Sequence, residues 1–451
     1  MSGYRLRDGG VVDRTRPLSF TWDGTRYTGL AGDTLGSAML ANGLGPVARG
    51  FKYHRPRGVM TAGPEETGAL VTLGRGARRE PNAKAPAVEL FEGLEATGQN
   101  AWPSVRFDLG RVNDLMGRFF SAGFYYKTFF GITGRGTWEW MQFEKLIRRA
   151  AGMGRAATPE DSVSDADVYD VVHDFCDVLV VGAGPSGLAA AAEAAGRGLD
   201  VMLVEQDFAL GGRLVGTGET VEGEDADAWI AGRAAALGGV RVLTRTTAFG
   251  LYDTNVVGLY ERLAEHLPDA DPALPRAALR IVRPGRVVLA TGAIERPIAF
   301  GNNDRPGVML AGAMERYAAR WGVGPGSRAV IATTNDSGYA AAARLASAGI
   351  EAVVLDAREK PGPATEACMA AAEAAGAEVR LGTVPVEVEG AAKVEGLAIG
   401  RAVEGGEAGT MVTERERVLR ADCVGTSGGW SPVIHLVAHR GVKPVWDAGE
   451  G

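Results

Sequence analysis

Six residues at the end of an apolar run carry the clearest chemical signal in the sequence. Gly182-Ala-Gly-Pro-Ser-Gly187 matches the pattern GxGxxG, which in dinucleotide-binding proteins lies between a strand and a helix. Gly182 permits a tight turn, Gly184 lets the backbone approach a pyrophosphate, and Gly187 lets the helix pack on the sheet. The N-terminus of the helix would then face the diphosphate with free N–H groups and a partial positive charge. The pattern therefore predicts dinucleotide binding through the phosphates.

The surroundings of this pattern make it specific. The pattern alone is weak, because 65 of the 451 residues are glycine and random text of that composition gives roughly one match. However, Asp177–Val181 predicts a buried parallel strand, Leu188–Gly196 a helix and Asp200–Val204 a second buried strand. Glu205 then stands at the spacing typical of a carboxylate that accepts both ribose hydroxyls and repels a 2′-phosphate. We predict NAD or FAD rather than NADP, and the alternative is a glycine-rich structural turn.

Other segments of the C-terminal half complete an α/β pattern. Arg286–Gly292 and Ala421–Pro432 are strand-like runs that end in small residues, as strands returning to a nucleotide do. Leu210–Arg213 follows Glu205 and is expected beside the cofactor. Ser327–Asp356 predicts a second βαβ unit, but its turn lacks the GxG pair. We interpret this second unit as a degenerate nucleotide-binding half kept as scaffold.

The N-terminal stretch predicts a small β-rich domain. Asp23-Gly24 joins two alternating runs as a hairpin, and a helix with Asp33 as N-cap and Asn42-Gly43 as its end follows. This order is similar to the start of plant-type ferredoxins, whose next loop carries C-x4-C-x2-C. The loop Gly45–Gly58 has no cysteine, so any such domain is without a cluster. Its basic and aromatic side chains favour either an anion or nucleotide contact or packing against a neighbouring domain or subunit, and they are Arg49, Phe51, Lys52, Tyr53, His54, Arg55 and Arg57.

Composition excludes several classes of function. With 48 basic and 55 acidic side chains the net charge is −7, which argues against a general nucleic-acid binder. Cys176, Cys368 and Cys423 lie too far apart for a CxxC redox pair, a zinc site or a disulfide framework. The polar N-terminus and the lack of a long apolar run predict no signal peptide and no membrane contact, so we expect a cytoplasmic chain. The aromatic-rich stretch Gln99–Asp170 favours packing between domains or a subunit interface.

Several unusual strings together give a family resemblance. They are Phe51–Gly58, Gly63–Glu66, Gln99–Ser104, Ala122–Thr128, Val180–Gly187, Asn303–Gly312 and Ser427–Pro432. The chain that carries them resembles the α subunit of heterotetrameric sarcosine oxidase. The resemblance implies an α/β fold, namely a two-part Rossmann-like FAD/NAD(P)-binding fold preceded by a cysteine-free ferredoxin-like (β-grasp) domain. The family's folate-binding C-terminal half is not in these 451 residues, so a truncated reading frame, a fragment and a split subunit are all open.

From the residues and the resemblance we expect five segments. Residues 1–98 form the ferredoxin-like domain and 99–170 the aromatic connection. The first part of the dinucleotide-binding domain covers 171–321, an inserted βαβ domain covers 322–385, and 386–451 return to the dinucleotide-binding domain.

The resemblance also implies a function and its cofactors. In the family, sarcosine is oxidatively demethylated to glycine with O₂, which yields H₂O₂ and formaldehyde or methylene-tetrahydrofolate. FAD lies in the β subunit, FMN lies at the interface with β, and the α subunit binds NAD and contributes no catalytic acid or base. The implied partners are the β, γ and δ subunits. The implied cofactor-binding residues are Gly182, Gly184, Pro185, Ser186, Gly187, Glu205, Gln206, Asp207, Gly212, Arg213, Ala248, Ala290, Thr291, Gly292, Thr426, Ser427 and Gly428.

Three other functions stay open at this point. One is an independent FAD- or NAD-dependent oxidoreductase, although the lack of CxxC removes a disulfide reductase. Another is an α-type subunit that serves a different amine or opine dehydrogenase or a cyanide-forming glycine dehydrogenase. The last is a structural remnant that assembles with nothing.

Overall fold

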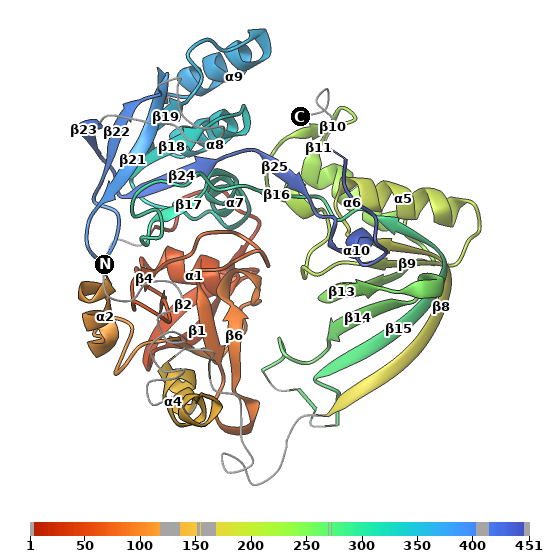
Figure 1. Cartoon of the computed structure of the whole chain (residues 1–451). Coiled ribbons are helices and arrows are strands. Elements are labelled where there is room, and N and C mark those ends of the chain that lie inside the picture. The colour runs from red at the N-terminus through yellow and green to blue at the C-terminus, as the bar shows by residue number, and fades with distance from the viewer. Residues whose placement is uncertain are drawn as a thin grey trace. The chain divides into compact units, whose positions relative to one another are not determined.

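The chain folds into two compact units, each built from two separate stretches of sequence. The computed structural model describes residues 4–117, 136–150, 154, 168–268, 270–271, 273–402 and 415–445 (Figure 1). Unit 1 comprises residues 1–165 and 296–429, and unit 2 comprises residues 166–295 and 430–451. Much of the predicted aromatic connection, including the string Ala122–Thr128, lies outside the described residues.

Unit 1 begins with a five-stranded sheet of order β2-β1-β7-β5-β6 and a helix packed against it. The elements are β1 (Asp13–Trp22), β2 (Thr25–Ala31), α1 (Leu35–Ala41), β5 (Leu70–Leu73), β6 (Glu80–Lys84) and β7 (Leu94–Gly98). The predicted hairpin is confirmed, since Asp23 and Gly24 have φ of 45° and 79°, as a type I′ turn requires. The helix N-cap is Thr34 and not Asp33, because Thr34 forms a capping box with Ser37.

Short elements follow this sheet in unit 1. β3 (Ala48–Arg49) and β4 (Pro56–Arg57) pair as a two-stranded ladder that closes the predicted ferredoxin-like loop. Two single helical turns precede β7 in the chain, namely η1 (Gly76–Arg78) and η2 (Ala85–Ala87). Among the described residues that follow β7, the helical segments of unit 1 before residue 165 are η3 (Leu109–Arg111), α2 (Val112–Leu115) and α4 (Thr137–Ala150).

The second part of unit 1 is a parallel sheet of order β17-β24-β18-β19-β20. Its strands are β17 (Val308–Leu310), β18 (Arg328–Thr333), β19 (Glu351–Asp356), β20 (Glu378–Leu381) and β24 (Cys423–Ser427). Its helices are α7 (Ala311–Trp321), α8 (Ser337–Ser347) and α9 (Pro363–Ala374). A separate antiparallel sheet contains β21 (Thr383–Glu389), β22 (Gly396–Arg401) and β23 (Arg415–Arg420). The predicted second βαβ unit is thus β18–α8–β19.

The two parts of unit 1 share one hydrophobic core. Buried side chains from the first sheet and α1, such as Phe20 and Met39, belong to the same cluster as Tyr317 and Trp321 of α7. The Tyr317 hydroxyl donates to the Thr61 carbonyl over 2.9 Å, and Trp321 Nε1 donates to a carbonyl of the β2–α1 connection over 3.1 Å. The cysteine-free N-terminal domain is therefore fixed to the second nucleotide-binding part by both apolar packing and hydrogen bonds.

Unit 2 is built on a six-stranded sheet of order β12-β9-β8-β15-β14-β13. The strands are β8 (Tyr169–Val181), β9 (Val201–Val204), β12 (Arg241–Leu243), β13 (Thr246–Leu251), β14 (Val257–Arg262) and β15 (Ala277–Leu289). The smaller elements are α5 (Pro185–Gly196), η6 (Gly212–Leu214), β10 (Thr220–Val221), β11 (Glu224–Asp225), α6 (Ala226–Ala235), η7 (Asp253–Asn255), β16 (Ala293–Glu295), β25 (Trp430–Pro432) and α10 (His435–Ala438).

Both faces of β8 are covered near its carboxyl end. Val180 packs in the cluster that contains Leu188 of α5 and Trp229 of α6, and these two helices lie on one face of the sheet (Figure 1). Leu179 packs in a second cluster that contains Leu436 of α10. This two-sided burial explains why the predicted strand is apolar without alternation.

The predicted fold class is confirmed, whereas two predicted segments have other bounds. Residues 296–321 belong to unit 1 and not with the first part of the dinucleotide-binding domain. Residues 423–427 form β24, which pairs with β17 and β18 in unit 1, so the inserted part reaches well past residue 385. In this region only residues 430–451 join unit 2, where β25 pairs with β16. All five residues of β24 are buried, and a short strand of small residues fits either parallel sheet equally well.

The environments of the three cysteines predict selective chemical labelling. Burial raises the pKa of the Cys176 thiol to about 11, and burial also raises the pKa of Cys423. At about pH 8 only about a thousandth of Cys176 would be thiolate, which is the reactive form. We expect iodoacetamide to label half-buried Cys368 in the native protein and to leave the other two intact, as peptide mass spectrometry would show. Protein unfolded in urea serves as the control and should be labelled three times; native labelling of Cys176 at the rate of Cys368 would contradict the expectation.

Candidate functional site

The turn from Gly182 to Gly187 leaves the carboxyl end of β8 and begins helix α5. Gly182 has φ of 98°, and a Cβ on it would lie 2.3 Å from the carbonyl oxygen of Ala290. A Cβ on Gly187 would lie 1.8 Å from the Gly182 carbonyl oxygen. Backbone approaches as short as these exclude any side chain, so both glycines are required by the fold itself.

Gly184 differs from these two glycines. It is the N-cap of α5 with φ of −68°, and a Cβ on it would meet no protein atom within 4 Å. Pro185 is the first residue of α5, Ser186 is the second, and no side chain caps the helix. The first turn of a helix leaves N–H groups without an intrahelical partner and carries a partial positive charge. The open space beside Gly184 therefore fits a diphosphate bound at this helix end.

Glu205 follows β9 and is bonded to the same turn. One carboxylate oxygen accepts from the Ala183 N–H over 2.7 Å, and the other accepts from the Asp207 N–H over 2.9 Å. The side chain is only 8% exposed. These contacts hold the Glu205 carboxylate beside the glycine turn. Gln206 is exposed next to it.

A glycine pair after Glu205 lies against the turn as predicted. Gly211 N–H donates to the Ala183 carbonyl over 2.8 Å, and a Cβ on Gly212 would lie 3.0 Å from Gly184 Cα. The guanidinium of Arg213 stacks on the Trp430 ring, 3.9 Å from its centroid. The contact brings a cation close to the phosphate turn, and the stacking partner Trp430 was not among the predicted site residues. The family string Ser427–Pro432, which contains Trp430, was the sequence signal for it.

The end of β15 closes the other side of the turn. Ala290 N–H donates to the Val181 carbonyl over 2.8 Å. The Thr291 hydroxyl donates to the Val433 carbonyl over 2.8 Å, and Val433 N–H donates to the Gly292 carbonyl over 3.0 Å. The structure thus gathers the turn, the end of β9, the Gly211–Arg213 segment and the end of β15 within unit 2.

Four predicted residues lie elsewhere. Ala248 is half-buried in β13, against the core of unit 2. Thr426, Ser427 and Gly428 lie in unit 1 at the end of β24, where the Ser427 carbonyl accepts from Asn335 Nδ2 over 3.0 Å. These three residues belong to the second nucleotide-binding part, because β24 pairs with β18 there.

The second turn, between β18 and α8, is occupied by the protein's own polar groups. Asp336 is the residue before α8 and lies where a phosphate would bind, and its carboxylate accepts from Arg358 over 2.9 Å. Arg358 also pairs with fully buried Asp356 over 2.7 Å, chiefly through hydrogen bonds that raise the pKa of the guanidinium. A carboxylate at the helix end repels a phosphate, which agrees with the interpretation of this half as scaffold.

A buried arginine holds the ferredoxin-like loop together. Arg49 is 7% exposed, and its guanidinium donates to the Val105 carbonyl over 2.8 and 3.0 Å and to the His54 carbonyl over 3.1 Å. Burial lowers the pKa of Arg49, while nearby Asp108 opposes this shift. His54 Nδ1 lies 2.8 Å from an Asp108 carboxylate oxygen. The cysteine-free loop is thus held by hydrogen bonds of Arg49 and by the contact between His54 and Asp108.

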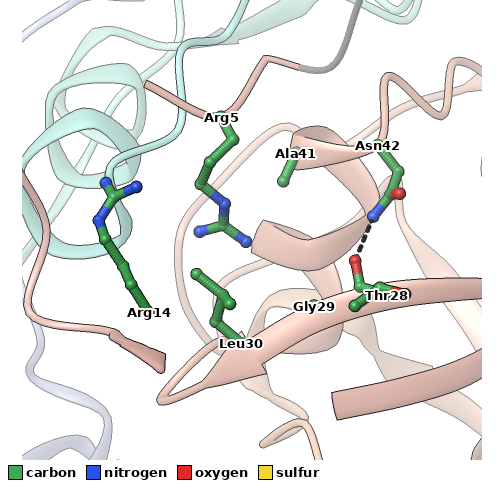
Figure 2. Close-up of a pocket in the computed structure, with 7 residues that line it drawn as sticks. All are labelled: Arg5, Arg14, Thr28, Gly29, Leu30, Ala41 and Asn42. Carbon is green, nitrogen blue, oxygen red and sulfur yellow. Dashed lines mark hydrogen bonds between the residues drawn. The ribbon is translucent and has the colours of Figure 1, made fainter. Parts of the chain in front are cut away.

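A surface cavity lies apart from these sites, in the first part of unit 1. It is lined by Arg5, Arg14, Thr28, Gly29, Leu30, Ala41 and Asn42 (Figure 2). Arg5 pairs with Asp33 over 2.5 Å, and Arg14 donates to two backbone carbonyls, so both cations are already engaged. No predicted site residue lines it. Among the described residues, no helix is long and apolar enough to cross a membrane, and no group of three acidic, histidine or cysteine side chains is placed to hold a metal.

Comparison with protein families supports both nucleotide-binding and ferredoxin-like parts. A model described as pyridine nucleotide-disulphide oxidoreductase matches residues 176–448, and a model described as 2Fe-2S iron-sulfur cluster binding domain matches residues 15–101. The first match covers more than half of the chain.

Individual relatives cover nearly the whole chain. The sarcosine oxidase subunit alpha of Rhizobium meliloti (strain 1021) is 45% identical over 99% of this chain and 43% of its own length. The same subunit of Corynebacterium sp. (strain P-1) is 37% identical over 97% of this chain and 40% of its own length. The chain therefore spans less than half the length of these relatives. The crystal structure of L-proline dehydrogenase from P. horikoshii shares the fold, with a TM-score of 0.61, 19% identity, and coverage of 98% of this chain and 65% of that chain.

Proposed function

The chain belongs to the pyridine nucleotide-disulphide oxidoreductase family, and from this premise we propose that it binds NAD in unit 2 as part of a sarcosine-oxidase-type α subunit. The matches to sarcosine oxidase α subunits confirm the predicted resemblance. One observation carries the proposal: buried Glu205 accepts from the backbone of the glycine turn that begins α5. The pyrophosphate would bind at Gly184 and Ser186, and the ribose at Glu205.

The carboxylate of Glu205 predicts a preference between the two nicotinamide cofactors. We expect the chain to bind NAD at least about tenfold more tightly than NADP, because a buried carboxylate repels a 2′-phosphate. Glu205→Gln should weaken NAD binding about tenfold or more, since hydrogen bonds to a charged acceptor contribute about 1.5–3 kcal/mol. Isothermal titration calorimetry on the full chain measures both effects. Glu219→Gln, at an exposed glutamate of the same unit, is the matched control. Equal affinities for NAD and NADP would contradict the assignment.

An exposed apolar surface in unit 1 supports assembly with partner subunits. The segment from Trp102 to Met116 exposes large side chains, with Leu115 at 84%, Trp102 at 69% and Phe107 at 65%. Exposed aromatic and aliphatic groups gathered on one segment are typical of surfaces that another protein covers. We place the proposed β, γ and δ subunits as the partners of the complex, with FAD in β and FMN at the interface between β and this chain.

Within that complex the proposed reaction is oxidation of sarcosine at the flavins. Sarcosine, O₂ and water give glycine, formaldehyde and H₂O₂, and methylene-tetrahydrofolate replaces formaldehyde where folate is bound. The residues of this chain bind and orient the dinucleotide, and the alternatives remain another secondary amine or an independent oxidoreductase.

Two measurements test the proposal. Mass spectrometry of nucleotide released from denatured protein should find NAD, whereas release of FAD and bleaching by NADH would favour the independent oxidoreductase. Co-expression with β, γ and δ subunits of a sarcosine oxidase should give sarcosine-dependent O₂ consumption. A chain that copurifies with no partner and retains no nucleotide would overturn the proposal.

A further inference from the structure

Two arginines meet at a single carboxylate in unit 1, and a third arginine follows that carboxylate in the chain. Arg55 Nη2 donates to Asp304 Oδ1 over 2.7 Å, and Arg57 Nη1 donates to Asp304 Oδ2 over 2.5 Å. Arg305 follows Asp304, and its charge interacts with those of Arg55 and Arg57. The Arg305 guanidinium is therefore within electrostatic range of the other two.

This cluster has more positive charge than the protein neutralises. The three guanidinium groups face the carboxylates of Asp304 and Asp114, which leaves an excess of one positive charge. Burial, followed by the neighbouring Arg55 charge, lowers the pKa of Arg305, so the environment penalises its cation. Asp114 acts in the opposite direction, and it is the other acidic side chain that faces Arg305.

Unpaired donors accompany the excess charge. The Nε atoms of Arg55 and Arg305 are buried, and within the described part of the chain neither has a hydrogen-bond partner. A buried donor left unpaired costs about 1–3 kcal/mol, and more when the group is charged. The cluster therefore retains both charge and hydrogen-bonding capacity for a further acceptor.

The backbone around the cluster is well ordered by its own hydrogen bonds. β3 pairs with β4 on one side, and Gly50 N–H donates to the Arg55 carbonyl over 2.9 Å. On the other side, Asn302 accepts from Arg55 over 2.8 Å while its Nδ2 donates to Glu387 over 2.9 Å. The Asn302 amide therefore helps to orient the Arg55 guanidinium.

We propose that Arg55, Arg57 and Arg305 form a binding site for a phosphate group, with Asp304 as the carboxylate that orients the first two. A phosphate group supplies the negative charge that the cluster lacks. Planar guanidinium groups present paired N–H donors whose geometry matches phosphate oxygens. The phosphate belongs either to free inorganic phosphate or to a phosphomonoester such as a mononucleotide. The site lies wholly in unit 1 and does not rest on the proposed NAD site of unit 2.

The test compares phosphate binding by the full chain and by single variants. Inorganic phosphate should raise the melting temperature and bind measurably by calorimetry, and Arg305→Gln should weaken that binding at least about tenfold because one charged donor is lost. Arg305→Lys keeps the positive charge and should therefore retain part of the affinity that Arg305→Gln loses. Arg328→Gln, an arginine of the same unit that pairs with Glu351 at the surface, is the matched control.

The outcomes distinguish the source of the phosphate and can overturn the site. If adenosine monophosphate binds much more tightly than inorganic phosphate, and if this difference depends on Arg305, the ligand of the site is a mononucleotide. If the two bind equally, the ligand is free phosphate. An unchanged phosphate response in folded Arg305→Gln would assign the binding to unit 2 and overturn the proposal. Binding of adenosine as strong as that of its monophosphate would overturn it as well.

Discussion

Replacing Gly187 by alanine is expected to destabilise unit 2 by about 3 kcal/mol and to abolish dinucleotide binding. The new Cβ would lie 1.8 Å from the Gly182 carbonyl oxygen, and a backbone atom has no rotamer by which to move away. The turn must therefore open, which costs about as much as severe overpacking of a core. Thermal unfolding of the full chain, followed with and without NAD, measures both losses.

Two neighbouring glycines separate the structural effect from the effect on binding. Gly196 ends the same helix, and a Cβ there meets nothing within 4 Å, so Gly196→Ala should leave stability and binding intact. Gly184→Ala adds a Cβ in open space at an ordinary φ of −68°, so the fold should survive while NAD binding is lost. A Gly184→Ala variant that binds NAD normally would contradict the placement of the pyrophosphate at this turn.

The second large effect is expected at Glu66 in unit 1. Its side chain is 1% exposed, and its two carboxylate oxygens accept five backbone N–H groups, those of Met60, Thr61, Thr67, Gly68 and Ala69, at 2.6–3.0 Å. Glu66→Gln keeps the shape but places an amide NH₂ against two or three of these donors. Each buried donor left unpaired costs about 1–3 kcal/mol, so we expect the free energy of unfolding to fall by about 3 kcal/mol or more.

The loop that Glu66 orders also joins the two parts of unit 1. Leu310 N–H donates to the Met60 carbonyl over 2.9 Å, and Tyr317 donates to the Thr61 carbonyl. Loss of stability should therefore extend to the second nucleotide-binding part, which hydrogen exchange on α7 would detect. Glu65→Ala, at the half-buried neighbouring glutamate, serves as control and should change stability by less than about 1 kcal/mol. Normal stability of Glu66→Gln would show that water or backbone movement satisfies these donors.

The sequence predicted local features well because short-range physics determines them. The type I′ turn at Asp23-Gly24, the strand–turn–helix around Gly182 and the spacing to Glu205 each depend on a few adjacent residues. The family string Gly63–Glu66 was visible too, but its role was not, because the donors that Glu66 binds are backbone groups common to every residue. Only the folded loop shows that they converge on one carboxylate.

Long-range pairing was the part that sequence reasoning missed. β24 is buried throughout, so its pattern does not indicate which parallel sheet it joins, and Thr426–Gly428 were placed with the wrong neighbours for that reason. The Arg55–Asp304 contact joins residues 249 positions apart, and neither segment predicts its contact with the other. Arg55 and Arg57 belonged to a run with an anion-binding interpretation, whereas Arg305 was visible only as part of the family string Asn303–Gly312.

The buried Arg49 bears on how the protein matures in the cell. Domains that depend on a metal centre for their stability fold only when that centre is supplied. In this chain the Arg49 guanidinium links the carbonyls of Val105 and His54, so the loop is held by groups of the polypeptide itself. We therefore expect the N-terminal domain to fold without iron and without cluster-assembly factors, because the loop Gly45–Gly58 has no cysteine to bind a cluster. Cells starved of iron should accumulate this domain in its folded form as readily as cells supplied with it.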